Sequence, residues 1–349
     1  MPNRQIKIAE RRVMKREKLT LGIETSCDET AAAVIEGTRK IRSETIATQI
    51  PIHRQYGGVV PEIASRNHIL SVLPVIDEAI KRANIEKSDI DQVAVTYGPG
   101  LAGALLVGVS AGKALAYALN VPLIGVNHLE GHIFANFLSA PELEPPFMAL
   151  VVSGGHTSLV KVEGYNKFSP WGQTRDDAAG EAFDKVARVL GLPYPGGPAI
   201  DELAKEGKVV IDFPHALMKD GNYDFSFSGL KSAVLNYLNS AHMRGISVSK
   251  ADVAASFQAA VVDVLVYKTI DAVKHSGLKS VAIAGGVAAN SILNLKLQEA
   301  AKQNGIKFYF PGAKLCTDNA AMIACRGAYM AQDGLFFDLT LNAVPNLTL

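Results

Sequence analysis

The chain has 349 residues, of which 48% are hydrophobic and 20% are charged, so it can bury a substantial core and is not disordered as a whole. Its length suggests two domains or one large α/β unit, and its net charge of +1 excludes a strongly basic nucleic-acid clamp. The three cysteines, Cys27, Cys316 and Cys325, form no C-x-x-C pair, which fits a reducing cytoplasmic location and argues against a disulfide scaffold.

The first 18 residues differ in charge from the rest of the chain. Residues 1–18 hold seven Lys or Arg and two Glu, whereas the remaining residues hold 28 basic and 32 acidic side chains. The leader contains no apolar segment, so it does not resemble a secretory signal. We expect a flexible basic extension, with Met14 as an alternative start. An arm that touches nucleic acid is a second interpretation.

The next hundred residues alternate short apolar runs with turns and helical patterns. Residues 21–24 predict a strand and residues 25–30 a polar turn. Ser26-x-x-Glu29 resembles a helix capping box, but Gly37 ends the following run so early that a return strand over 31–35 is favoured. The further elements expected here are a strand over 41–50, a helix over 62–83 with Ile69, Leu73, Ile76 and Ile80 at helical spacing, a strand over 91–96, a Gly98-Pro99-Gly100 turn and a helix that opens at Asn127.

One stretch is apolar enough to resemble a membrane span. Leu101 to Val126 contains a single charged residue, Lys113, and is rich in Gly and Ala. Because it follows a glycine turn and runs into Pro122, we interpret it as a buried helix followed by a buried strand over 121–126. No membrane-spanning segment is predicted.

The second half repeats the pattern of the first. After a linker-like segment at 142–146, residues 148–152 predict a strand, 153–157 a polar turn and 158–162 a return strand. A later strand over 281–284 runs into two glycines, as the earlier strand runs into the G-P-G turn. This predicts a duplicated α/β chain with two lobes and facing glycine turns, and nucleotides often bind where such lobes meet. The alternative is that glycine turns are simply common in α/β proteins.

The sharpest local signal is the segment Asn127-His128-Leu129-Glu130-Gly131-His132. On a helix, His128 and His132 lie one above the other and can direct two imidazoles at one metal ion, although a pair of packed or surface histidines has the same spacing. A zinc peptidase needs Glu directly after the first His, whereas Glu130 is about 200° around the helix. We expect Asn127 to cap the helix and Glu130 to reach back to the cap. Asp318 is the candidate third ligand, which gives a set that suits Fe(II) or Zn(II).

Three further segments are candidate binding elements. Ser153-Gly154-Gly155 can present backbone N–H groups to a phosphate or carboxylate, or can form an ordinary tight turn. The segment from Gly285 to Asn290 follows a strand and opens a helix without the G-x-G-x-x-G order, so we expect backbone contact with a nucleoside and a hydrogen bond from Asn290. Asp184 lies ahead of a Pro/Gly-rich loop and is either a ribose ligand or a solvated helix acid.

Taken together, these segments resemble the universal tRNA threonylcarbamoyladenosine transferase family, whose bacterial members are called TsaD and were once described as O-sialoglycoprotein endopeptidases. The resemblance spans about residues 20–345. Its motifs are GIETSCDET, GGVVPEIASR, TYGPGLAGALLVG, NHLEGH, VVSGGHTSLV, GEAFDKVARVLGLPYPGGPAID, FSFSGLKSAV, VAASFQAAVVDVL, GGVAAN and CTDNAAM. The resemblance implies the two-lobed actin/hexokinase/Hsp70-like fold, built from duplicated ribonuclease-H-like lobes with the active site between them. We expect residues 19–140 with 317–349 in one lobe and residues 141–316 in the other.

The resemblance also implies an activity and its residues. The family transfers a threonylcarbamoyl group from threonylcarbamoyl-adenylate to N6 of the adenosine at position 37, beside the anticodon, in tRNAs that read codons beginning with A. One divalent ion per subunit, Fe(II) or alternatively Zn(II), would be held by His128, His132 and Asp318. The substrate contacts would be Val151, Val152, Ser153, Gly154, Gly155, Asp184, Gly197, Asp201 and Asn290, and the candidate proton acceptors are Glu24, Asp28 and His156.

The expected partners follow from the same resemblance. Beyond tRNA and the adenylate, it implies an inactive paralogue as heterodimer partner and a small ATPase, in the cytoplasm and without a membrane. A body with more acidic than basic residues should bind a phosphate backbone weakly by itself, which agrees with a need for accessory proteins. The rival interpretations are a metallopeptidase, a sugar or acetate kinase of the same fold, and a non-catalytic nucleotide-binding scaffold.

Overall fold

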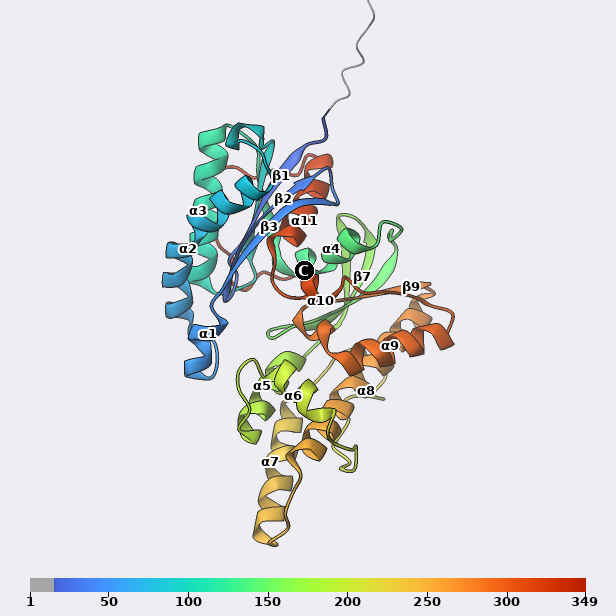
Figure 1. Ribbon diagram of the computed structural model, residues 1–349. Helices are drawn as coiled ribbons and strands as arrows, with labels where there is room; N and C mark the ends of the chain where they lie inside the picture. Colours follow the sequence, from blue (N-terminus) through green and yellow to red (C-terminus); the bar gives the residue numbers. More distant parts are fainter. Residues whose placement is uncertain (1–15) are drawn as a thin grey trace, which may run out of the picture.

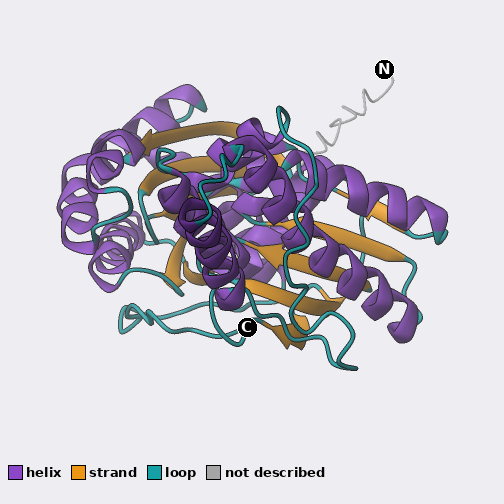
Figure 2. Cartoon of the chain, turned by 90° about the horizontal axis from the view of Figure 1, so that it is seen from below, coloured by secondary structure: helices purple, strands orange, loops and turns teal. Residues whose placement is uncertain are grey.

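The computed structural model describes residues 16–349, and the chain folds around two five-stranded sheets flanked by helices, as Figures 1 and 2 show. The predictions on residues 1–15 of the leader lie outside the described residues. The first sheet contains β1 (Leu19–Glu24), β2 (Glu29–Glu36), β3 (Lys40–Thr48), β4 (Gln92–Gly98) and β5 (Leu123–Asn127). The second contains β6 (Phe147–Val152), β7 (Thr157–Gly164), β8 (Lys167–Gln173), β9 (Ser280–Ala284) and β10 (Lys307–Tyr309).

Helices of very different length connect and cover these strands. They are α1 (Ile50–His53), α2 (Pro61–Arg82), α3 (Ala102–Leu119), α4 (His128–Ser139), α5 (Ala179–Leu190), α6 (Gly196–Ala204), α7 (Ser228–Met243), α8 (Lys250–Ser276), α9 (Ser291–Gln303), α10 (Ala313–Cys316) and α11 (Ala320–Gln332). Short 3-10 turns lie at Arg54–Tyr56, Lys87–Asp89 and Gly286–Ala289.

The two sheets have the same topology. The order is β3-β2-β1-β4-β5 in the first and β10-β9-β6-β7-β8 in the second, which is the same sequence of steps read from the opposite edge. In each sheet the first strand pairs antiparallel with the next strand in the chain and parallel with the fourth. The predicted duplication and the two-lobed α/β fold are therefore confirmed.

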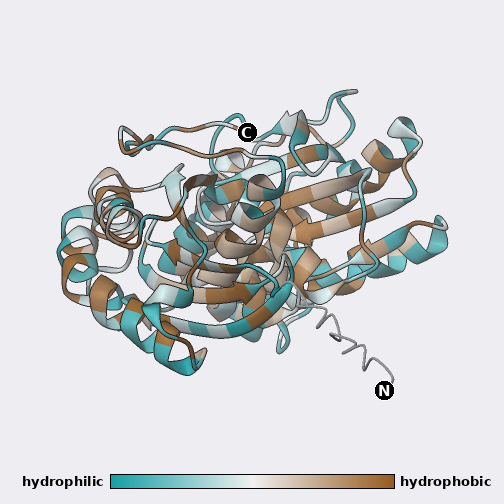
Figure 3. Cartoon of the chain, turned by 90° about the horizontal axis from the view of Figure 1, so that it is seen from above, coloured by the Kyte–Doolittle hydropathy of each residue, from teal (hydrophilic) through white to brown (hydrophobic). Residues whose placement is uncertain are grey.

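The predicted hairpin at the start of the chain is confirmed over the capping-box alternative. β1 and β2 pair from Leu19↔Glu36 to Glu24↔Ala31. Ala31, Ala32 and Ala33 form a strand despite their low β propensity, because both faces of this sheet are covered and small side chains allow close packing. The strand interiors are mainly hydrophobic, as Figure 3 shows.

The last helix returns to the first sheet and packs directly on it. α11 contacts β1, β2 and β4, and the contact is close because Gly22 and Gly327 carry no side chain. The segment after α11 continues along the same sheet, where Phe337 N donates to Leu123 O at 2.9 Å and Val344 N donates to Tyr97 O at 2.7 Å. The sequence immediately before α11, which contains Asp318, is thereby fixed beside the ends of β1 and β4.

Two helices are long and apolar enough to cross a membrane by length and composition alone. In α8, 83% of the apolar window is buried inside the protein, as in a core helix, whereas in α3 only 33% is buried. The prediction that α3 is a buried helix is thus wrong, because one of its faces is open to solvent. α2 also exposes part of its apolar surface, with Ile69 63% and Leu73 59% accessible, since its buried face runs through Ala64, His68, Val72 and Ile76 instead.

Candidate metal centre

The histidine pair lies on the first turns of α4, between the two sheets. Asn127 ends β5 and caps the helix, its Oδ1 accepting from Leu129 N at 2.8 Å, as predicted. The rings of His128 and His132 lie one above the other, with centroids 4.6 Å apart and planes 83° apart. Both residues are buried. The two imidazoles therefore project from consecutive turns of α4 toward the same point, where both could bind one ion.

The prediction for Glu130 is wrong. Its carboxylate does not return to the cap but accepts from Arg326 Nε on α11 at 2.6 Å. Arg326 is itself buried, stacks 4.9 Å from the ring centroid of Phe134, and can leave its guanidinium charge unpaired only at a large cost. Glu130 is thus a structural partner on the far side of the helix from the histidine pair.

Asp318 completes the cluster from the other end of the chain. Its Oδ1 lies 3.2 Å from His132 Nε2 and 3.5 Å from His128 Nε2, and one ligand atom from each of the three residues falls within 4.8 Å of the others. Asn319, the next residue, caps α11 by accepting from Met322 N at 2.9 Å, which fixes the backbone beside Asp318. The predicted set of three candidate ligands is brought together by the fold.

Glu24 orients His128 from behind. The carboxylate is fully buried at the end of β1, and its Oε2 lies 3.1 Å from His128 Nδ1 while it accepts from Thr96 Oγ1 at 2.6 Å. Ser26 N donates to the other oxygen. With Nδ1 engaged, Nε2 of His128 is the nitrogen that faces Asp318, which is the arrangement of a carboxylate–histidine–metal triad. Thr96 was not recognised from the sequence as part of the site.

The pKa values of the three clustered side chains are all shifted from their usual values. Burial by itself would lower the pKa of His128, but the charges of Glu24 and Asp318 outweigh burial and raise it to about 10. Burial likewise opposes ionisation of Asp318, yet the neighbouring His128 charge holds the pKa of that carboxyl far below its usual range. Burial lowers the pKa of His132, which is therefore neutral at pH 7. Two carboxylates around two imidazoles leave an excess of negative charge that favours a cation.

The donors fit a divalent transition-metal ion. Nδ1 of His132 is buried without a hydrogen-bond partner, and the buried Nε2 lies 3.2 Å from Asp318 Oδ1 without the geometry of a hydrogen bond, a state that costs free energy unless another ligand binds there. Two imidazole nitrogens and one carboxylate with open positions suit Fe(II) or Zn(II). His128, His132 and Asp318 are thus the residues that would hold the ion, with Glu24 as their outer support.

Binding of a metal ion should release about one proton at neutral pH. The ring of His128 carries a proton up to pH of about 10 before an ion binds, and a metal needs the neutral ring. Affinity should therefore fall as pH falls, by about tenfold per pH unit between roughly pH 9 and pH 7. Titration calorimetry in buffers with different ionisation enthalpies measures the proton directly. Release of no proton at neutral pH would contradict the prediction.

Replacing the outer carboxylate should weaken the site without dismantling it. Glu24→Gln keeps the shape of the side chain but removes the charge that orients and polarises His128, so metal affinity should fall about 10–100-fold. Competition with a chromophoric chelator measures the change. Thr96→Val, which removes only a neutral hydrogen bond to Glu24, is the matched control and should have a smaller effect. Equal affinities for wild type and Glu24→Gln would show that Glu24 does not support the ligands.

The other candidate proton acceptors differ in their surroundings. Asp28 lies on the turn between β1 and β2, where burial and then the charge of Asp318 raise its pKa, and Tyr194 Oη lies 3.5 Å from its carboxylate. His156 follows the glycine turn; burial and the neighbouring His128 and His132 lower its pKa to about 4. Its imidazole is neutral at pH 7. Of these side chains, Asp28 combines an accessible position with a raised pKa.

The glycine turn after β6 presents open backbone beside the cluster. A Cβ built on Gly154 or Gly155 would meet no atom within 4 Å, and the same holds for Gly197 and Gly286. In contrast, Gly180 on α5 packs so closely on the turn that a Cβ would lie 2.5 Å from Ser153 O. The side chains of Val151 and Val152 are fully buried, so only their backbone can contribute to binding. Four glycine positions therefore border free space where a ligand backbone or phosphate can approach.

The remaining predicted contacts lie around the same space but already have partners. Asp184 accepts from Gly196 N at 2.7 Å and so holds the turn that carries Gly197. Asp201 accepts from Ser291 Oγ at 2.8 Å. Asn290 caps α9 through Leu293 N at 2.9 Å and donates to Gln258 Oε1 at 2.8 Å, which leaves one amide N–H for a ligand. These three side chains therefore hold the glycine segments in place, and most of their hydrogen-bonding groups are already used within the protein.

Two hydrogen bonds join the segment after β3 to the region of α5 and α6. Arg54 Nε donates to Tyr194 O at 3.0 Å, and Arg188 donates to Gly57 O at 2.6 Å. Together with the Tyr194–Asp28 pair, they bring the region of α5 and α6 against the turn that holds Asp28. No sequence pattern indicates these contacts, because their partners are more than 100 residues apart.

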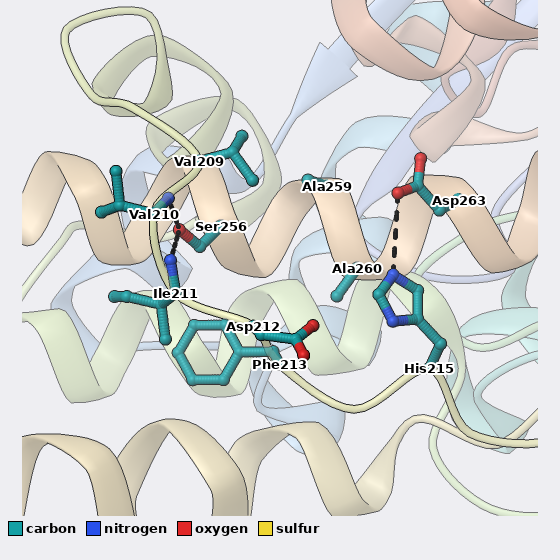
Figure 4. Close-up of a pocket in the computed structure, with 10 residues that line it drawn as sticks. All are labelled: Val209, Val210, Ile211, Asp212, Phe213, His215, Ser256, Ala259, Ala260 and Asp263. Atoms are coloured by element: carbon teal, nitrogen blue, oxygen red, sulfur yellow. Dashed lines mark hydrogen bonds and ion pairs between the residues drawn. The ribbon is translucent and has the colours of Figure 1, made fainter.

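A separate groove lies on the surface of α8. Figure 4 shows the segment 209–213 beside α8, with Ser256 Oγ accepting from Val210 N and Ile211 N at 3.1 Å. The groove encloses about 310 Å³ and is lined by Val209, Val210, Ile211, Asp212, Phe213, His215, Ser256, Ala259, Ala260 and Asp263. None of the predicted site residues borders it, so the candidate site is the histidine–aspartate cluster and not this groove.

The family model of tRNA N6-adenosine threonylcarbamoyltransferase (TsaD) matches residues 40–325. The chain belongs to this family. Relatives of that name from Clostridioides difficile strain 630 and from Moorella thermoacetica are each 57% identical over 330 residues, covering 94% of this chain and 98% and 96% of theirs. The resemblance predicted from the motifs is thereby confirmed.

Solved structures of low sequence identity share the fold of this TsaD family member. HypF of T. kodakarensis superposes with a TM-score of 0.63 at 15% identity and covers 91% of this chain and 48% of its own. Component A of the (R)-2-hydroxyglutaryl-CoA dehydratase of Acidaminococcus fermentans gives a TM-score of 0.53 at 16% identity, covering 90% and 99%. These similarities concern the fold, which is the predicted actin/hexokinase-like one.

Proposed function

We propose that this protein transfers a threonylcarbamoyl group from threonylcarbamoyl-adenylate to N6 of the adenosine at position 37 in tRNAs that read codons beginning with A, and releases AMP. The observation that carries the proposal is the buried His128–His132–Asp318 cluster beside open glycine backbone, in a chain of the TsaD family. The cluster would hold the reacting end of the adenylate through a metal ion. The glycine backbone would bind the phosphate and the nucleoside of the adenylate.

The reaction is an acyl-type transfer between bound reactants. The N6 nitrogen attacks the carbamoyl carbon, the bond from that carbon to the phosphate oxygen breaks, AMP leaves with the electron pair, and N6 loses a proton. A bound divalent ion would supply Lewis acidity toward the negative charge that develops on the oxygens. Backbone amides of the Ser153-Gly154-Gly155 turn stabilise the phosphate. Because an exocyclic amine is a poor nucleophile, orientation of the reactants supplies much of the rate.

Asp28 is the proton acceptor that the surroundings favour. Its raised pKa makes it a better base than an ordinary carboxylate, and its half-buried position lies near enough to Asp318 for the two charges to interact. Glu24 is fully engaged with Ser26 N, Thr96 and His128, and its pKa is lowered by His128 despite burial, so it positions the histidine instead. His156 is a weak base, because its pKa is about 4.

Fe(II) is the proposed ion, one per subunit, with Zn(II) as the alternative. Two imidazoles and one carboxylate with free positions match the donor set that non-haem Fe(II) sites use, and Zn(II) accepts the same donors. Metal analysis of protein isolated without oxygen and without chelators distinguishes the two ions. Activity of protein reloaded with each ion then decides which one supports transfer.

We further propose that residues 19–140 with 317–349 and residues 141–316 act as two lobes that close on the substrates. The two sheets support this division, since they have the same topology and lie within residues 19–127 and 147–309. The return of α11 to the first sheet explains why the end of the chain belongs with its beginning.

Accessory proteins are part of the proposal. The described body has no marked positive charge, so tRNA binding needs help from elsewhere, and we propose an inactive paralogue as heterodimer partner and a small ATPase, in the cytoplasm. Large apolar side chains are exposed on the neighbouring helices α2 and α3, where a partner would cover them. They are Ile69, Leu70 and Leu73 on α2 and Leu106 and Tyr117 on α3.

Reconstitution tests the function. The protein is mixed with an adenylate-forming synthase, the accessory proteins, threonine, bicarbonate, ATP and tRNA, and digested tRNA is searched by mass spectrometry for the modified adenosine. Purified adenylate in place of the synthase isolates the transfer step. Formation of the nucleoside only when this protein is present supports the proposal, and its absence with every component active refutes it. The metallopeptidase alternative is not favoured, because Glu130 is bound to Arg326 and is unavailable as a peptidase base.

A further inference from the structure

A buried histidine on α2 contacts both ends of the turn that carries Asp28. His68 is fully buried, and it is a polar residue on a face of α2 whose other buried residues are apolar. Its Nε2 lies 2.8 Å from the backbone oxygen of Cys27, and its Nδ1 lies 2.8 Å from Thr30 Oγ1. An imidazole at this position therefore spans the turn from residue 27 to residue 30.

The two contacts define the tautomer of the ring. The oxygen of Cys27 can only accept, so Nε2 of His68 carries a proton and donates. Burial lowers the pKa of His68, so the ring is neutral and Nδ1 accepts from the hydroxyl of Thr30. Both nitrogens are satisfied, which makes up for the cost of burying a polar ring in an apolar helix face.

Two backbone hydrogen bonds also hold this turn, and the contacts of His68 at Cys27 and Thr30 add to them. Leu101 N donates to Ser26 O at 2.8 Å, and Gln49 N donates to Asp28 O at 3.0 Å. The carboxylate of Asp28 itself lies 3.5 Å from Tyr194 Oη and beside the Cys27 thiol. The direction of this carboxylate therefore depends on the conformation of the turn, which Gln49 N holds at Asp28 O and His68 holds at Cys27 O and at the Thr30 hydroxyl.

We propose that His68 is a positioning residue for the transfer reaction: by bridging Cys27 O and Thr30 Oγ1, it fixes the turn so that the Asp28 carboxylate faces the metal cluster. The proposal rests on the proposed function and adds a role for a residue that contacts neither substrate nor metal. Its effect passes through the turn, so it should change the chemical step and leave the binding of metal and substrates nearly unchanged.

Three substitutions separate the parts of the bridge. His68→Leu removes both bonds with a similar volume, His68→Gln keeps a donor near the position of Nε2, and Thr30→Val removes only the hydroxyl. In steady-state assays with purified adenylate, tRNA and the accessory proteins, we expect His68→Leu to lower kcat on the order of 10–100-fold with KM within about twofold, because a small displacement of a reacting group has effects of this size. His68→Gln should restore most of the rate, and Thr30→Val should lose less than His68→Leu. His242→Leu, on the exposed end of α7, is the matched control.

The Cys27 thiol provides a readout that does not depend on activity. Cys27 is the partly accessible thiol of the chain, since Cys316 and Cys325 are buried, and burial raises its pKa well above the usual value. In the native protein it should react slowly with a disulfide reagent. His68→Leu should accelerate that reaction at least severalfold while bound metal per subunit stays the same, and Cys27→Ser should abolish it.

The outcomes decide between positioning and simple packing. Slower transfer and faster Cys27 labelling in His68→Leu, with recovery in His68→Gln, support the proposal. Wild-type kcat and labelling in folded His68→Leu would overturn it, as would equal losses in His68→Gln and His68→Leu. If His68→Leu fails to fold, His68→Gln and Thr30→Val carry the same comparison. If the wild-type protein makes no modified nucleoside, the proposed function fails, whereas the labelling rates still test the bridge.

Discussion

The double variant His128→Ala, His132→Ala is expected to bind no metal and to lose threonylcarbamoyl transfer by more than about 100-fold, while remaining folded. The two imidazoles are the only nitrogen donors of the cluster, and Asp318 alone cannot hold a transition-metal ion at micromolar concentration. Folding should survive because α4 is anchored by its Asn127 cap and by buried apolar residues such as Ile133 and Phe134.

The measurement combines metal analysis, circular dichroism and the reconstituted transfer assay. His242→Ala and His275→Ala, which lie outside the cluster, form the matched double control and should behave like wild type. Single Asp318→Asn should retain part of the metal, because an amide oxygen remains. Full transfer by the double variant would remove the metal centre from the mechanism.

Gly22→Ala should destabilise the protein by about 3 kcal/mol and weaken metal binding as well. A Cβ at this position would lie 2.8 Å from Ala324 Cβ and closer still to Ala320 O, so the methyl group meets the backbone at the start of α11. Since Asp318 lies two residues before α11, a displacement of the helix moves the carboxylate away from the histidine pair. Gly22 is remote in sequence from His128, His132 and Asp318, yet its substitution should increase the distance between Asp318 and the two histidines.

Gly229→Ala is the matched control for this prediction. Gly229 lies near the start of α7, and a Cβ there meets no atom within 4 Å, so the change should be neutral or slightly stabilising. Thermal unfolding with and without added metal measures both effects. A melting temperature and metal affinity of Gly22→Ala equal to those of wild type would mean that α11 adjusts freely on the sheet, and that its close packing does not set the position of Asp318.

Much of the fold could be predicted from local sequence. Alternating runs and glycine turns located the two hairpins and indicated the duplication, and the identical strand orders of the two sheets confirm it. The register of a histidine pair on one helix face is likewise a local property, because the α-helix fixes the angle between positions four residues apart. Family motifs then assigned the third ligand, which lies nearly 200 residues away.

Other features are decided by tertiary packing. Glu130 fits a capping box by spacing, but a buried Arg326 on α11 needs a counter-charge and takes the carboxylate. Leu73 follows the helical pattern and is nevertheless exposed. A periodic pattern shows which residues share a face of the helix, but it does not show whether another element packs against that face.

The chain by itself determined the elements, the duplication and the histidine pair, because each depends on residues a few positions apart. Only the tertiary structure decided that Glu24 and Thr96 support His128, that Asp28 meets Tyr194, and that His68 spans the turn at Cys27 and Thr30. These contacts join residues 38 to 166 positions apart, and such pairs depend on how whole layers pack and not on any local preference.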